Sequence, residues 1–324
     1  MYMNTYNDKG KIRERAAHWM PNRDGKKPIK IVTDTTDFFQ VQFNDVVQLG
    51  EKAYLIRHNA KEGRFGLDDE VKQWVKRAID LETEDSKILK LVFYEKFMTS
   101  VGHIEFECFR SPRKEARILD LVKDHPNFMH GFSVEDEKGN LVRILDYIHG
   151  KPLSHVVGDF NLDHKQYFFE HFPTILSNFI ECIDAIRFLH DHGEKHGDIR
   201  RDHIFVDRES KVYRWIDFDY NYRHRENIYG YDLFGLGNIL MFLAGKGDVL
   251  LPDLKRQRPD VLDNLVEDDV NIVFRNRLAN LKKAYPYIPE RLNRVMMHFS
   301  LGANWYYENA SQMLEDLQDA RKDL

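Results

Sequence analysis

Cysteine is scarce in this chain, and neither one sign of charge nor long apolar runs dominate it. The 324 residues include only two cysteines, Cys108 and Cys182, which is too few for a disulfide framework or a four-thiolate zinc site. A formal net charge of -5 argues against the broad basic surface of a nucleic-acid-binding protein. The longest nearly apolar run, residues 233–244, is shorter than the about 20 residues that cross a bilayer. We therefore expect a cytoplasmic globular protein with no nucleic-acid partner and no membrane span.

The residue pattern changes twice along the chain. Residues 1–30 are polar, have more Lys and Arg than Asp and Glu, and lack apolar periodicity, which predicts a flexible basic arm. Residues 31–149 contain short runs rich in Val, Ile, Phe, Tyr and Thr, typical of an antiparallel sheet. Residues 150–324 are mostly helical in pattern. The expected fold class is α+β, with a sheet-rich N-terminal lobe that carries one main helix and a mostly helical C-terminal lobe.

Individual elements can be assigned within this division. The predicted strands are 38–43, 53–57, 72–79, 88–94, 128–134 and 141–148. Pro112 opens an expected helix whose apolar face carries Ile118, Leu119 and Val122. A long amphipathic helix spans Phe172 to Ile186, and a small hairpin at 204–206 and 212–216 interrupts the helical part.

One segment carries most of the chemical information. His196 begins the sequence HGDIRRDHIFV, and Asp217-Phe218-Asp219 follows 19 residues after Asp198. These residues resemble the catalytic loop H-x-D-x-x-x-x-N and the metal-binding D-F-G of the protein kinase-like superfamily. The hairpin between them folds the chain back and brings Asp217 beside the loop. One carboxylate can then meet an acceptor hydroxyl while the other holds a metal ion on the phosphates of ATP.

The resemblance covers residues from about 50 to 320 and implies a bilobal protein kinase-like fold that uses ATP with Mg²⁺ or Mn²⁺. It implies that Asp198 orients and deprotonates the acceptor, that Arg200 supplies a cation, and that Asp217 with His203 binds metal. It also implies that Asp232 hydrogen-bonds the catalytic-loop backbone. The implied ATP-binding positions are two turn glycines, a lysine–glutamate pair and the segment joining the lobes: Gly63, Gly66, Lys90, Glu115, Asp146, Tyr147 and Ile148.

Several of these residues also have a purely structural interpretation. Lys90 lies in an otherwise apolar strand and needs an anion, and Glu115 shares the helix face of Ile118. Taken singly, Lys90 is typical of an edge or snorkelling lysine, and Glu115 of a solvated helix charge. Gly63 and Gly66 are also typical of plain turns. Their joint appearance in the order that the superfamily requires favours the functional interpretation.

The departures from the superfamily pattern define the expected subclass. His203 stands where the pattern has Asn, and an imidazole suits Mn²⁺ or Zn²⁺ better than Mg²⁺. Asp219 replaces Gly, Gly197 replaces an Arg that would bind a loop phosphate, and the 12 residues between Asp219 and Asp232 contain no Ser or Thr. We expect an atypical, bacterial-type Ser/Thr protein kinase-like enzyme with features of small-molecule phosphotransferases, its phosphoacceptor a protein or a small molecule. The alternative is a pseudokinase, a nucleotide-binding or protein-interaction module without turnover.

Overall fold

The computed structural model describes residues 9–20, 28–62, 70–101, 104–223 and 227–324. Strands dominate the N-terminal half and helices the C-terminal half, which confirms the α+β class. The chain divides into two compact units. Unit 1 comprises Met1–Glu95, Ser111–Lys123 and Met129–Ile148, and unit 2 comprises Lys96–Arg110, Asp124–Phe128 and His149–Leu324. The three-part division expected from the sequence stays a prediction.

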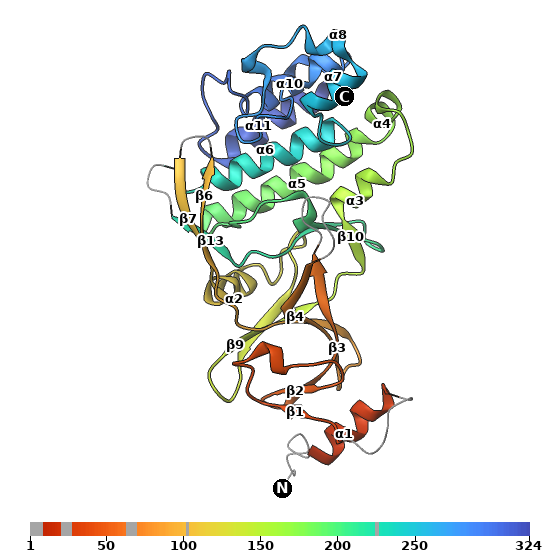
Figure 1. Cartoon of the computed structure of the whole chain (residues 1–324), viewed down its shortest axis with the longest axis vertical. Coiled ribbons are helices and arrows are strands. Elements are labelled where there is room, and N and C mark those ends of the chain that lie inside the picture. Colours follow the sequence, from red (N-terminus) through yellow and green to blue (C-terminus); the bar gives the residue numbers. More distant parts are fainter. Residues whose placement is uncertain (1–8, 21–27, 63–69, 102–103, 224–226) are drawn as a thin grey trace. The chain divides into compact units, whose positions relative to one another are not determined.

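Unit 1 is built on a seven-stranded sheet with the order β1-β2-β3-β4-β5-β9-β8 (Figure 1). Among the described strands of this sheet, β1 and β2 pair in parallel and the other neighbours pair antiparallel. A buried cluster that includes Tyr54, Ile56, Leu89 and Ile144 fills the interior. The strands are β1 (Ile31–Val32), β2 (Val46–Leu49), β3 (Lys52–Glu62), β4 (Glu70–Asp80), β5 (Ser86–Lys90), β8 (Gly131–Glu135) and β9 (Leu141–Asp146).

Helix α2 (Pro112–Leu121) packs against β8 and β9 of this sheet. The Ser111 side chain accepts a hydrogen bond from the backbone of Lys114, and Pro112 occupies the first turn. Such a cap contributes about 1 kcal/mol to helix stability. Ile118, Leu119 and Val122 are fully buried, as their spacing predicts, so the inward face of α2 is fixed.

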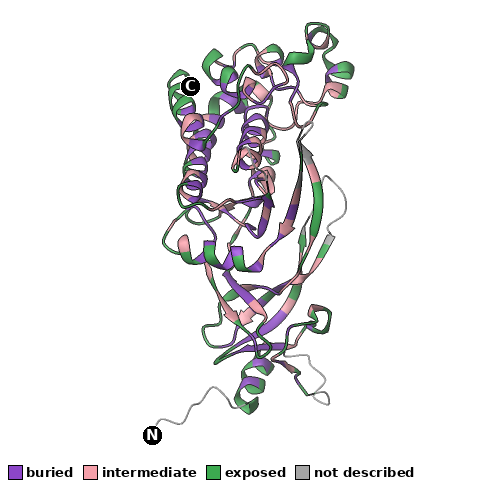
Figure 2. Cartoon of the chain, turned by 90° about the vertical axis from the view of Figure 1, so that its left-hand side faces the viewer, coloured by how far each residue is buried: buried purple, intermediate pink, exposed green. Residues whose placement is uncertain are grey.

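Unit 2 is organised around α5 (Phe172–Asp191), which packs against α6 (Gly230–Ala244) and α11 (Ala310–Ala320). Many residues of these helices are buried, purple in the ribbon of Figure 2, and form the core of the unit. Its two three-stranded sheets have the orders β10-β11-β12 and β13-β7-β6. The remaining elements are β6 (Lys96–Val101), β7 (Ile104–Arg110), β10 (Gly150–Pro152), β11 (Ile204–Asp207), β12 (Tyr213–Trp215), β13 (Tyr220–Arg223), α3 (Leu153–Gly158), α4 (His164–Glu170), α7 (Leu251–Gln257), α8 (Pro259–Leu262), α9 (Leu281–Ala284) and α10 (Glu290–Met297).

The structure corrects two expected strands and adds one helix. At 38–43 the chain forms a single 3-10 turn, Phe38–Gln40, because the Asp37 carboxylate accepts the Phe39 N–H at 3.0 Å. The strand expected at 88–94 ends at Lys90 as β5. Within the segment expected to be a flexible arm, α1 (Lys9–His18) buries Ile12 and Ala16, which lie one turn apart.

The hairpin formed by β6 and β7 has no counterpart among the expected strands.

Within the described residues, no helix is long and apolar enough to cross a bilayer.

Candidate functional site

A buried aspartate fixes the loop that precedes β11. Asp232, in the first turn of α6, accepts the backbone N–H groups of His196 at 2.8 Å and Gly197 at 2.9 Å. Its carboxylate also lies 3.1 Å from Nε2 of His190. Burial alone would raise the pKa of Asp232, but the bonds from His190 and the loop outweigh burial and lower it. The ionised carboxylate therefore holds the backbone that leads into Asp198, as the sequence predicts.

His203 lies between two aspartates at the end of this loop. Its Nδ1 is 2.9 Å from the backbone oxygen of Asp198. A carbonyl oxygen only accepts hydrogen bonds, so Nδ1 bears a proton and the lone pair of the neutral ring is on Nε2. Nε2 lies 3.7 Å from a carboxylate oxygen of Asp217, and Nδ1 lies 3.5 Å from a carboxylate oxygen of Asp198.

The β11–β12 hairpin returns the chain to the loop. The backbone N–H of Ile216 donates to the carbonyl of His203 at 2.9 Å, so Asp217 follows directly beside the imidazole. Asp217 is 8% exposed and has a left-handed backbone with φ of 61°. A non-glycine residue pays about 1–2 kcal/mol for this conformation, which the surrounding contacts must supply. Such local strain is often found at functional positions.

This donor set fits a divalent cation. A histidine that ligates a metal commonly donates its other N–H to a backbone carbonyl, which orients the ring, and His203 makes that contact with Asp198. Nε2 of His203 and the carboxylate of Asp217 lie close enough, after a small adjustment, to share one ion. One nitrogen and one carboxylate oxygen suit Mn²⁺ better than Mg²⁺.

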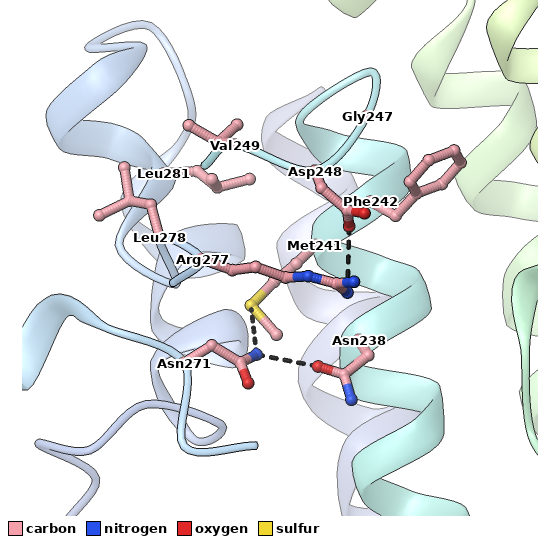
Figure 3. A pocket seen from close by; sticks show the side chains of 10 residues that line it. All are labelled: Asn238, Met241, Phe242, Gly247, Asp248, Val249, Asn271, Arg277, Leu278 and Leu281. Carbon is pink, nitrogen blue, oxygen red and sulfur yellow. Dashed lines mark hydrogen bonds and ion pairs between the residues drawn. The ribbon is translucent and has the colours of Figure 1, made fainter. Parts of the chain in front are cut away.

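Two arginines follow Asp198 and point in different directions. Arg200 lies 3.8 Å from the Asp198 carboxylate and also binds Asp202. Arg201 binds Asp248 at 2.8 Å, and Arg277 binds the same carboxylate at 3.1 Å. Asp248 and Arg277 line the recess drawn in Figure 3, together with Met241, Phe242 and other residues of the α6 end and the segment after it. Asp248 thus ties the catalytic-type loop to later parts of unit 2.

In unit 1, Lys90 and Glu115 form the ion pair that the sequence predicts. Nζ of Lys90 lies 2.7 Å from Glu115, and their side chains are 5% and 0% exposed. The second oxygen of Glu115 accepts from Nε of Arg143 at 3.0 Å. Arg143 is the register partner of Lys90 across β5 and β9. Two cations facing each other on neighbouring strands repel unless an anion lies between them, and Glu115 is that anion.

The other predicted ATP-binding positions are less distinctive. Asp146 is exposed and pairs with Lys87 at 2.8 Å, while its backbone N–H already donates to His130. The ring of Tyr147 lies under the guanidinium of Arg77 at 4.3 Å, and Ile148 is partly buried. Gly63 and Gly66 lie outside the described residues.

The predicted site residues therefore fall into two sets. Asp198, Arg200, His203 and Asp217 come together in unit 2. Lys90 and Glu115 come together in unit 1. The sequence pattern missed Arg143, because its role depends on the register between β5 and β9. It also missed Arg110, whose Nη1 lies 2.8 Å from Asp219 and 3.9 Å from Asp217.

Comparison with known proteins supports the protein kinase-like superfamily in general terms. The chain is 28% identical over 159 residues to CBL-interacting protein kinase 1 of Oryza sativa subsp. japonica, covering 49% of this chain and 30% of that protein. It is 27% identical over 122 residues to the serine/threonine-protein kinase max-2 of Caenorhabditis elegans, covering 35% of this chain and 17% of that protein.

A third relative carries a different name. Over 166 residues the chain is 27% identical to the 2-5A-dependent ribonuclease of Mus musculus, covering 49% of this chain and 22% of that protein. No family model matches the chain. The chain spans less than a third of the length of each of these three relatives.

Proposed function

We propose that the chain is an atypical kinase that transfers the γ-phosphoryl group of ATP to a hydroxyl acceptor. The observation that carries the proposal is the set of side chains in unit 2. The His203 ring lies 3.5 Å from the carboxylate of Asp198 and 3.7 Å from that of Asp217, and the buried Asp232 holds the backbone that leads into Asp198. Phosphoryl transfer requires positioning and charge stabilisation rather than covalent chemistry from the protein, and a held loop supplies both.

Each unit contributes separate tasks in this proposal. Asp198 of unit 2 accepts the proton of the acceptor hydroxyl, and Arg200 stabilises the negative charge of the group being transferred. Asp217 and His203 hold Mg²⁺ or Mn²⁺, which neutralises the developing charge on the phosphates. In unit 1, Glu115 fixes the Lys90 ammonium, which binds the phosphates of ATP. The hinge segment Asp146–Ile148 and the glycines 63 and 66 complete the proposed nucleotide contacts.

The acceptor remains open between a protein side chain and a small molecule. Two of the relatives are named as protein kinases, one of them as a serine/threonine-protein kinase, which supports a serine or threonine acceptor. The short segment between Asp219 and Asp232 is instead a feature of small-molecule phosphotransferases.

A pseudokinase is the second candidate, and the observation that favours it is the imidazole of His203 beside Asp217. If His203 hinders Mg²⁺ binding there, the chain would bind nucleotide without turning it over.

The role of each residue can be tested by separating binding from transfer. We expect Lys90→Met and Asp217→Asn to weaken the binding of ATP with Mn²⁺, measured by calorimetry. Asp198→Asn should leave binding nearly unchanged and reduce transfer by about 100-fold or more. The matched control is Lys52→Met, which makes the same change at an exposed position of β3. A loss of ATP affinity in Asp198→Asn as large as in Lys90→Met would contradict these roles.

A further inference from the structure

The hairpin of β6 and β7 is paired to the strand that follows Asp217 (Figure 1). Strand β7 runs antiparallel to β13, with Arg110 opposite Tyr220 and Cys108 opposite Tyr222. Strand β6 pairs with the other edge of β7. The short strand β13, which begins three residues after Asp217, therefore lies in one sheet with β7 and β6, which precede α2 in the chain.

Arg110 is the last residue of β7 and binds Asp219, the residue before β13. Its Nη1 lies 2.8 and 2.9 Å from the two carboxylate oxygens of Asp219 and 3.9 Å from Asp217. Its guanidinium also lies 4.0 Å from the ring of Tyr220. The Arg110 and Asp219 side chains are 1% and 3% exposed, so water does not weaken this ion pair.

Two further contacts fix the middle of β13. Tyr222 and Cys108 are buried together and pack against Tyr231 and Phe234 of α6. Lys195, which immediately precedes His196, donates to the backbone oxygen of Tyr222 at 2.9 Å and lies 4.1 Å from its ring. Strand β13 is thus attached to the hairpin, to α6 and to the start of the loop that carries Asp198.

The sequence lacks the residues by which phosphorylation would order the segment between Asp219 and Asp232. The 12 residues between Asp219 and Asp232 contain no Ser or Thr, and Gly197 replaces the arginine that would bind a loop phosphate. Tyr220 and Tyr222 are 4% and 1% exposed, so neither hydroxyl is presented for modification. A permanent ion pair in this region needs no added phosphate to order the segment.

We infer that the β6–β7 hairpin is a built-in brace for Asp217, and that Arg110, acting through Asp219, is the residue that positions Asp217. This inference rests on the proposed kinase function and specifies its regulation. The enzyme is held in its competent arrangement without phosphorylation of the 220–231 segment. In this inference, Asp219 stands where the superfamily pattern has glycine because its carboxylate binds Arg110.

The central test uses Arg110→Gln, Asp219→Gly and the double variant. Arg110→Gln leaves Asp219 buried without its arginine, which destabilises folded proteins. The double variant removes that carboxylate as well and restores the residue of the superfamily pattern. We expect each of the three variants to lower kcat/KM for ATP by a similar factor, about 100-fold, with kcat lowered and the KM for ATP raised, because Asp217 also holds the metal that binds with ATP. Similar single and double losses indicate that the two side chains act as one unit.

The matched control is Arg223→Gln, at the last residue of β13. The Arg223 side chain is 77% exposed and lies 3.9 Å from Glu107 of β7, so the variant removes an ion pair between β13 and the hairpin at a position away from Asp217. We expect wild-type kcat and wild-type hydrogen exchange in this control. Control losses equal to those of Arg110→Gln would show that any weakening of the hairpin suffices, and would overturn the role of Arg110.

A readout independent of turnover is hydrogen exchange of the β13 amides without nucleotide. We expect faster exchange over β13, residues 220–223, in the Arg110→Gln/Asp219→Gly variant, with unchanged exchange in α5. Normal turnover and normal β13 exchange in that variant would overturn the inference. Phosphatase treatment of the wild type should leave kcat unchanged, and a large loss would also overturn it. A wild type that never transfers phosphate contradicts the proposed function instead, while the exchange experiment still tests the brace.

Discussion

At the scale of single residues, the site depends on side chains that each satisfy more than one partner. Glu115 binds Lys90 through one oxygen and Arg143 through the other. Lys90 and Glu115 could be predicted because a lysine in an apolar strand requires an anion, and helix periodicity places Glu115 inward. Arg143 could not be predicted, since only the strand register shows that it faces Lys90. The same holds for Arg110 and Asp219, which are separated by 109 positions.

His203 gives the sharpest prediction at this scale. If Nε2 of His203 shares a metal with Asp217, replacing the imidazole by an amide oxygen should favour Mg²⁺, a harder ion. We expect His203→Asn to lower the ratio of the Mn²⁺ rate to the Mg²⁺ rate by about tenfold, the scale of changes in metal-site ligation. Steady-state transfer with each metal measures this ratio.

The control for this experiment is His192→Asn, an exposed histidine of the same loop. An unchanged ratio in His203→Asn would mean that His203 only hydrogen-bonds the loop. A wild type inert with both metals but active after His203→Asn would identify the chain as a pseudokinase created by this histidine.

His164 gives a prediction about stability and pH. Its Nε2 donates to the carbonyl of Ala244 at 2.9 Å, its Nδ1 lies 2.6 Å from the hydroxyl of Tyr287, and its ring stacks on Tyr285 at 3.4 Å. Burial lowers the pKa of His164 to about 4. The unfolded chain binds this proton near pH 6.5 and the folded chain does not, so the stability from neutral His164 is complete above about pH 6.5 and is lost towards pH 4.

We expect this loss to be about 2 kcal/mol, discounted because the ring is partly exposed. Urea unfolding between pH 7.5 and 4.5 would show a shallower pH dependence for His164→Phe, which keeps an aromatic ring over Tyr285. His155→Phe, at an exposed position of α3, should keep the wild-type slope. Equal slopes for the wild type and His164→Phe would contradict the assignment.

At the scale of elements, local periodicity predicts some segments and fails for others. The long helix α5 and the hairpin of β11 and β12 could be predicted, because apolar spacing and turn residues specify them within a few residues of chain. The β6–β7 hairpin could not, because β13, its partner strand, lies more than 100 residues later. At 38–43, the local hydrogen bond of Asp37 outweighs the strand preference of two phenylalanines.

The attachment of α6 to the loop before β11 gives a prediction at this scale. The carboxylate of Asp232 accepts from the backbone N–H groups of His196 and Gly197 and lies beside Nε2 of His190. Asp232→Asn removes its charge and replaces one acceptor oxygen by an NH₂ group, which cannot accept these hydrogen bonds. We expect a loss of about 3 kcal/mol in the free energy of unfolding, measured in urea, together with faster hydrogen exchange at residues 195–199. Asp253→Asn, on the more exposed helix α7, is the control. A stability change below about 0.5 kcal/mol in Asp232→Asn would show that the loop is held by other contacts.

At the scale of the whole molecule, the α+β class, with strands mostly in the N-terminal half and helices mostly in the C-terminal half, follows from composition and periodicity. The candidate residues of unit 2 were predictable as a set because the catalytic-type loop, the hairpin and Asp217 are close in sequence. The ion pair of Arg110 with Asp219 could not be predicted from the sequence. Arg110 lies in a segment of unit 2, although the chain on both sides of this segment belongs to unit 1. Chain order alone does not reveal this exchange.

The central claim is that this chain transfers phosphate from ATP, and metal-dependent ATP turnover tests it most directly. The wild type and Asp198→Asn are assayed side by side with Mg²⁺ and with Mn²⁺, and ATP binding is verified for both proteins. The account predicts turnover by the wild type with at least one metal, faster with Mn²⁺, and its loss in Asp198→Asn while binding persists. ATP binding by the wild type without turnover under either metal, or equal turnover in Asp198→Asn, would contradict it.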